Sequence, residues 1–154
     1  MATGALPGWL KPMNRVMIAL TNMGLALGPM RVLTVPGRKS GAMRSTPVST
    51  LMVDGQRYIV GGLAGADWVK NVRVAGWGVL AQGRKKECVR LIELPVEARA
   101  PILRAFPRLV PGGVQFFRRV YDMPKDPALL PEAFAGLADR CPVFRIEAEA
   151  TVAR

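Results

Sequence analysis

Apolar residues recur along residues 9–27 at the spacing of a helix. One face of a helical projection carries Trp9, Met13, Val16, Leu20, Met23 and Leu27, and the polar residues fall mostly on the other side. This pattern predicts an amphipathic helix within an N-terminal segment, residues 1–29. The helix would pack on the core, cover an apolar channel or lie against a membrane surface.

From residue 30 onward the pattern changes to that of β-structure. Runs of β-branched and apolar residues bounded by turn residues predict strands at residues 31–35, 45–53, 57–61, 77–81, 87–94 and 142–146. Between the second and third strands stands Asp54-Gly55, a pair favoured in two-residue hairpin turns. The fourth and fifth strands form a second hairpin, closed around residues 82–85.

Helices are predicted between and after these hairpins. Asp67 is expected to cap the start of a short helix that Gly76 ends. Residues 95–106 and 114–121 also read as helical. The region around them is expected to break into short pieces at Pro107, Pro111, Pro124, Pro127 and Pro131.

Short strands with a helix inserted between hairpins predict a mainly β (α+β) fold. We expect a closed or split antiparallel β-barrel, which leaves few exposed sheet edges, with the N-terminal amphipathic helix and short peripheral helices around it. A length of 154 residues predicts one domain over residues 1–154.

Charge and composition narrow the function. Twenty-two Lys and Arg against eleven Asp and Glu give a net charge of +11, which predicts an anionic partner. The chain has no His and only two Cys, at positions 88 and 141, so we expect no metal site and two buried thiols of a reducing compartment. An aromatic content of 6% disfavours nucleic-acid binding. We expect a cytoplasmic protein, in which residues 9–27 are the candidate contact with lipid or with the inner face of a membrane.

The most chemically suggestive segment follows the first strand. This segment carries Arg38, Lys39 and Ser40 between Gly37 and Gly41, and Arg44 follows. It therefore contains three cations and a hydroxyl. Glycines let a backbone approach an anion closely, and Lys and Arg donate charge-assisted hydrogen bonds to phosphate or carboxylate. The alternative is an ordinary solvated hairpin loop.

A series of motifs in fixed order extends this segment. They are Leu33-Thr34, the loop 37–41, Arg44, Pro47, the hairpin through Asp54-Gly55 into residues 58–62, and Trp68-Val69-Lys70-Asn71. The series resembles the nitroreductase-like, deazaflavin-dependent oxidoreductases of actinobacteria, whose split β-barrel binds coenzyme F420. The resemblance covers about residues 30–94 and returns more weakly at residues 142–146.

This resemblance implies a role for each matched position. Lys39 and Arg44 would contact the phosphate and acidic tail of F420, with Arg38 and Ser40 in the same loop. The deazaflavin ring would lie along the backbone of Ile59, Val60, Gly61 and Gly62, and Pro47 would shape the ring site. Trp68 and Asn71 would close the pocket. Glycines at 61 and 62 would let a flat ring approach the strand.

The resemblance also implies an activity and leaves some points open. A protein with these side chains must take hydride chemistry from a cofactor, so we expect reduced F420 to reduce an electron-poor small molecule such as an enone, a quinone or a nitroaromatic. The segment 63–67 is shorter than in the family. Tyr121 is the candidate substrate-side group. A lipid carrier that uses Met13, Met17, Met23 and Met30 is the alternative, and both a monomer and a homodimer fit.

Overall fold

The computed structural model describes residues 30–149, and the six strands among these residues close an antiparallel barrel. The strands are β1 (Met30–Pro36), β2 (Met43–Val53), β3 (Gln56–Val60), β4 (Trp77–Gln82), β5 (Lys85–Glu93) and β6 (Val143–Ala148). Their order around the barrel is β1-β2-β3-β6-β5-β4. The predicted barrel and its strands are therefore confirmed. The helix predicted over residues 9–27 lies outside the described residues.

Both hairpin turns follow from local backbone preferences. Asp54 and Gly55 have φ values of 51° and 78°, the left-handed region that a two-residue turn of this type requires. The β4–β5 turn is tighter than predicted, because Gln82 pairs with Lys85 and only Gly83 and Arg84 remain between the strands.

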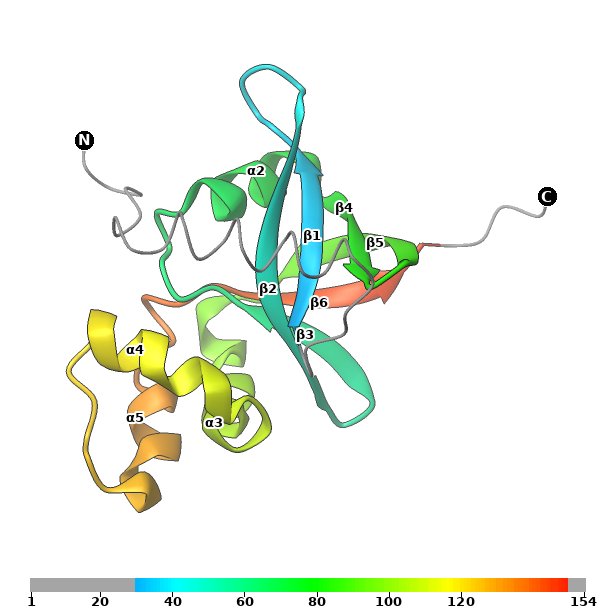
Figure 1. Ribbon diagram of the computed structural model, residues 1–154. Helices are drawn as coiled ribbons and strands as arrows, with labels where there is room; N and C mark the ends of the chain where they lie inside the picture. The colour runs from blue at the N-terminus through cyan, green and yellow to red at the C-terminus, as the bar shows by residue number, and fades with distance from the viewer. Residues whose placement is uncertain (1–29, 150–154) are drawn as a thin grey trace.

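Four short α-helices lie at two places on the described part of the barrel (Figure 1). α2 (Asp67–Ala75) packs against β1 and β4 near one end of the barrel, and the other helices gather at the opposite end. They are α3 (Ala100–Leu109), α4 (Val114–Val120) and α5 (Leu130–Ala135), with single 3₁₀ turns at Val96–Ala98, Pro111–Gly113 and Pro127–Leu129. No helix among residues 30–149 has the length and apolar character needed to cross a bilayer.

Three predictions about the helices were wrong. Ala66, not Asp67, is the N-cap of α2, and Asp67 is the first helical residue. Pro107 lies inside α3 instead of ending it, because Ile102, Leu103 and Phe106 are buried on its inner face and this packing outweighs one missing backbone donor. Pro131 was expected to break the chain, but it lies in the first turn of α5, where a proline is tolerated, and this helix was therefore missed.

The core has two parts. Inside the barrel, Leu33, Ile59, Val89 and Phe144 pack with Val69 and Val72 of α2. In the helical lobe, α3–α5, the rings of Phe106, Phe117 and Phe134 pack together, with centroids of Phe117 and Phe134 4.7 Å apart. The barrel core therefore fixes α2, and the second cluster joins the lobe to the barrel through Leu51 and Val143.

The barrel pairing leaves a split beside β2. Residues 43–49 of β2 pair with β1, whereas only residues 50–53 pair with β3. β3 ends at Val60, and the amide of Gly61 donates to the Pro142 carbonyl at 2.8 Å instead of continuing along β2. One side of residues 43–49 thus has no strand partner among the described strands, and the chain from β3 to α2 runs on this side of β2 (Figure 1).

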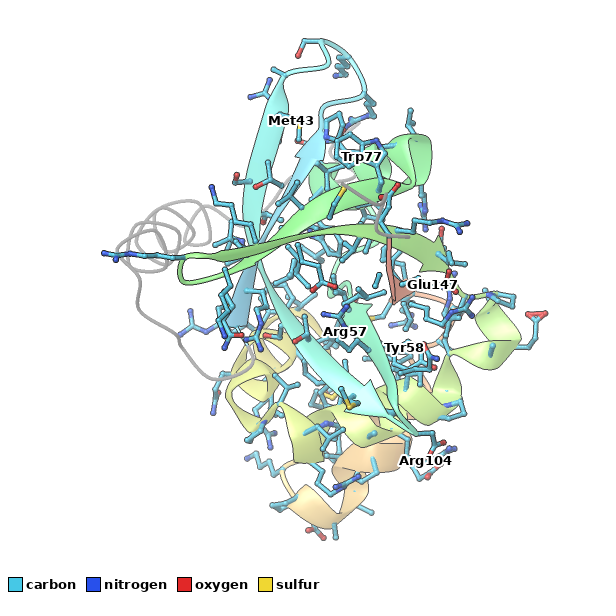
Figure 2. The ribbon with its side chains drawn as sticks, turned by 90° about the vertical axis from the view of Figure 1, so that its right-hand side faces the viewer. Met43, Arg57, Tyr58, Trp77, Arg104 and Glu147 are labelled. Atoms are coloured by element: carbon cyan, nitrogen blue, oxygen red, sulfur yellow. The ribbon has the colours of Figure 1, made fainter. Side chains whose placement is uncertain are left out.

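Figure 2 shows Met43, the first residue of β2, near Trp77 at one end of the molecule, and Arg104 of α3 at the opposite end. The loop that connects β1 with β2 leaves the barrel at the Met43 end. The predicted anion-binding loop and the helical lobe are thus at opposite ends of the protein.

Candidate functional site

A pocket of about 390 Å³ opens between the β1–β2 loop, the start of β2 and α2. Its walls are Gly37, Arg38, Lys39, Ser40, Arg44, Ser45, Thr46, Asp67, Trp68 and Asn71. Segments 37–46 and 67–71 are far apart in the sequence, and the barrel core brings them together by holding α2 against β1.

The loop itself is held by its own backbone. The Gly37 amide donates to the Ala42 carbonyl at 2.8 Å, and the Gly41 amide donates to the Gly37 carbonyl at 2.8 Å. Gly41 has a φ of 78°, and a Cβ at Gly37 would come within 3.0 Å of the Ala42 oxygen. The two glycines are therefore needed for the turn, and the Ser40 hydroxyl supports it by accepting from the Ala42 amide at 3.2 Å.

Arg38 is anchored to α2 instead of pointing into the pocket as a free cation. The Asn71 side-chain oxygen accepts two hydrogen bonds from it, from the backbone amide at 3.0 Å and from the guanidinium at 2.8 Å. Asp67 forms an ion pair with the same guanidinium at 3.2 Å. Asn71 is 4% exposed, so these contacts explain a buried amide for which the sequence offered no structural role.

Lys39 and Arg44 are the uncompensated charges of the pocket. Both are exposed, and neither charged group has an ion pair or hydrogen bond to any residue in the described range. Since Arg38 is paired with Asp67, the net positive potential in the pocket comes from these two side chains. They are free to donate to an incoming phosphate or carboxylate.

Trp68 serves both the core and the pocket. Its ring lies 5.8 Å from the ring of Phe144 in the barrel core, and a Cβ at Gly61 would touch it at 3.4 Å. The indole therefore lies between the pocket, which it lines, and Gly61.

Tyr121 lies beyond that segment, at the end of α4. Its hydroxyl donates to the Gly62 carbonyl at 2.6 Å, and its ring stacks with Phe117. Burial, followed by the nearby Cys141 thiol, raises the pKa of Tyr121 well above its usual range. At neutral pH the hydroxyl is therefore protonated and its proton is held by a backbone carbonyl.

The predicted site residues thus fall into two groups. The pocket brings together Arg38, Lys39, Ser40, Arg44, Trp68 and Asn71. Outside its walls lie Pro47, Ile59, Val60, Gly61, Gly62 and Tyr121. The Ile59 side chain is fully buried in the barrel, so only its backbone could face a ligand. Gly61 and Gly62 follow β3 and are not part of a strand.

Gly37 lines the pocket as part of the predicted loop, and three further pocket residues were not predicted as site residues: Ser45, Thr46 and Asp67. Ser45 and Thr46 stand directly between Arg44 and Pro47 in the sequence, and this position between two predicted site residues could have identified them. Asp67 was expected only to cap the helix. Its ion pair with Arg38 depends on a contact between segments that the sequence does not reveal.

Both cysteines are free thiols, but only Cys141 is buried as expected, and Cys88 is exposed. Desolvation raises the pKa of Cys141 to about 11. In the stretch from 30 to 149, no group of three or more Cys, Asp or Glu side chains is placed to hold a metal ion.

The barrel, its split and the cationic pocket define a small split-barrel protein with a site suited to an anionic ligand beside β2. The family model described as F420H(2)-dependent quinone reductase matches residues 13–110. Because this match covers more than half of the 154 residues, the chain belongs to that family. Its members are oxidoreductases that use reduced coenzyme F420.

Solved structures share the fold at low sequence identity. A structure described as a domain-swapped dimer is 21% identical, covering 90% of this chain and 97% of its own, with a TM-score of 0.55. An F420-H2 dependent reductase, FDR-A, is 22% identical over 80% of this chain and 98% of its own, with a TM-score of 0.53. The Agrobacterium tumefaciens protein Atu2129, of unknown function, is 13% identical over 96% of this chain and 59% of its own, with a TM-score of 0.53. No curated protein matches this chain.

Proposed function

We propose that this protein binds reduced F420 with Lys39 and Arg44 on the anionic part of the coenzyme, and that it catalyses hydride transfer to an electron-poor small molecule such as a quinone, an enone or a nitroaromatic. The observation that supports this proposal is that the two cations have no partner among residues 30–149. The third cation of the pocket, Arg38, already forms an ion pair with Asp67.

The residues present fit the coenzyme's charged portion. A phosphate in the pocket would meet the two free cations, and Ser45 and Thr46 of β2 also line the pocket. Ser45 shares a hydrogen bond of 2.7 Å with Thr34, so its position is fixed before any ligand arrives. Charge-assisted hydrogen bonds of this kind contribute about 1.5–3 kcal/mol each.

The gap beyond Trp68 suits the flat part of the coenzyme. One side of residues 43–49 has no strand partner within the described region, and Gly61 and Gly62 bring no side chain to the opposite wall. Pro47 lies midway along this edge and adds no backbone donor. We infer that the ring lies between these walls, with the phosphate in the pocket.

When bound, reduced F420 supplies a hydride from the C5 position of its deazaflavin. The protein's part is to hold this donor next to the acceptor and to limit access of water, since correct positioning alone can lower a barrier by about 7–11 kcal/mol at best. The acceptor gains the hydride and one proton. Because the Tyr121 proton is held by the Gly62 carbonyl, we assign the proton to solvent.

The direct test is titration of F420 into the protein, followed by fluorescence, for the wild type and for Lys39→Ala and Arg44→Ala. Each variant loses one charge-assisted contact, so we expect the dissociation constant to rise by about tenfold or more. Both losses should shrink at high ionic strength, because salt screens exposed charges.

The matched control is Arg84→Ala. Arg84 is an exposed cation on the β4–β5 turn and is not part of the pocket wall. Arg84→Ala therefore lowers the net charge by the same amount as the site variants without changing the pocket. The control should bind F420 like the wild type, and flavin mononucleotide should bind more weakly than F420 to all four proteins. Equal affinities for wild type, Lys39→Ala and Arg44→Ala would refute the site.

A further inference from the structure

Contacts from the helical lobe converge on a single residue of the gap, Gly62. Its carbonyl accepts the Tyr121 hydroxyl at 2.6 Å and lies 3.9 Å from the Cys141 sulfur, which in turn lies 3.6 Å from the Tyr121 oxygen. The Phe116 ring covers the same residue from α4, because a Cβ at Gly62 would stand 2.2 Å from its Cε2 atom.

The neighbouring residue, Gly61, is held from the other direction. Its amide donates to the Pro142 carbonyl at 2.8 Å, and a Cβ there would come within 3.0 Å of Pro142 and 3.3 Å of Val69. Trp68, which lines the pocket, is the third neighbour of this position. The two glycines are thus clamped between α2, which forms the anion pocket, and the start of β6 with α4.

This clamp gives the helical lobe a role in the proposed reaction. The aromatic core of the lobe packs on Leu51 of β2 and Val143 of β6, so close packing holds Phe116 and Tyr121 against Gly62. The part-buried hydrogen bond to the Gly62 carbonyl resists rotation of the Gly62 peptide. The backbone wall proposed to lie against the coenzyme ring is therefore set by contacts made 59 residues further along the chain.

We propose that Tyr121 is a positioning residue: its hydrogen bond to the Gly62 carbonyl, with the Phe116 ring across the same residue, holds the Gly61-Gly62 backbone in the form that receives the deazaflavin ring. This inference rests on the proposed function. It differs from a role of Tyr121 as proton donor, because the hydroxyl keeps its proton and acts only through the backbone.

The test compares Tyr121→Phe with Tyr58→Phe, a change at the chain's other tyrosine, in β3. Loss of the hydroxyl leaves the Gly62 carbonyl with the distant thiol alone. We expect the F420 dissociation constant to rise about fivefold to twentyfold in Tyr121→Phe, and the Gly61 amide to exchange hydrogen faster in the absence of coenzyme. Tyr58→Phe should change neither quantity, and thermal unfolding verifies that both variants are folded.

A positioning role and a proton-donor role give different kinetics. Positioning predicts that Tyr121→Phe raises KM for reduced F420 and leaves the shape of the pH profile of kcat unchanged. A proton donor predicts a lower kcat, an altered alkaline limb and an unchanged coenzyme dissociation constant, and this result would overturn the inference.

Gly62 offers an independent experiment. Gly62 is not among the glycines with positive φ in the described region, so Gly62→Ala should weaken coenzyme binding only by displacing Phe116. Once Phe116→Ala has removed that ring, the addition of Gly62→Ala should cause no further loss of affinity. A further loss in the double variant Gly62→Ala/Phe116→Ala, or wild-type affinity in Tyr121→Phe, would refute the clamp while leaving the proposed function intact. A wild-type protein that does not bind F420 would overturn both.

Discussion

The contact between Asn71 and the loop is the part of the site whose energetic weight can be worked out most directly. Asn71→Leu keeps the size of a side chain that is 4% exposed and removes the oxygen that accepts two hydrogen bonds from Arg38. Arg38 then loses its main tie to α2 and keeps only Asp67, whose side chain is 76% exposed.

The magnitude follows from the two bonds. The bond from the guanidinium is of the charged class, about 1.5–3 kcal/mol, and the bond from the backbone amide is neutral, about 0.5–1.5 kcal/mol. Because the Arg38 side chain is 23% exposed, water replaces part of this loss, and we expect the free energy of unfolding to fall by about 2 kcal/mol. For a chain of this size the melting temperature should fall by about 4–8 °C.

The assay pairs thermal unfolding with titration of F420 and includes Asn71→Asp. A carboxylate at position 71 still accepts both hydrogen bonds and pairs with Arg38, so the loss of stability should be smaller than in Asn71→Leu. It also places a second negative charge in the pocket wall, and coenzyme affinity should fall. Asn71→Leu should lower both stability and affinity, because the loop that carries Lys39 is no longer held. If the Asn71→Leu variant melts and binds like the wild type, the anchoring role is refuted.

Two further predictions concern stability. Desolvation raises the pKa of Cys141 from 9.0 to about 11 in the folded protein, so the contribution of the buried thiol to stability is complete below pH 9 and is lost as the pH rises through 11. The difference in melting temperature between the wild type and Cys141→Ala should therefore shrink over that range. A constant difference would contradict the shift in pKa. Gly76 ends α2 with a φ of 76°, so Gly76→Ala should lower the free energy of unfolding, measured with denaturant, by about 1–2 kcal/mol. The control Gly112→Ala changes a glycine without positive φ and with open space around it, and it should lower the free energy of unfolding much less. Equal effects would show that the left-handed backbone is not the cause.

Local chemistry determined most of the fold. Alternation of apolar and polar residues located the six strands, and turn residues such as Asp54-Gly55 located the hairpins, because both depend only on neighbours in the sequence. The prolines misled for the same reason: their local effect is to break helices, but burial of Phe106 and Phe134 allowed α3 to run through Pro107 and α5 to form behind Pro131.

The sequence also identified the loop with Lys39 and Arg44, since a cluster of cations between glycines is visible without a structure. What each residue does there was decided by tertiary contacts. Arg38 and Lys39 are adjacent and similar in charge, yet one is bound to Asn71 and Asp67 and the other has no partner in the described part of the chain. Likewise, Tyr121 was recognised as a candidate, but its partner, the Gly62 carbonyl, lies 59 residues away. Charge and turn preference are properties of a segment, whereas the partner of a side chain depends on which distant segment the barrel core brings beside it.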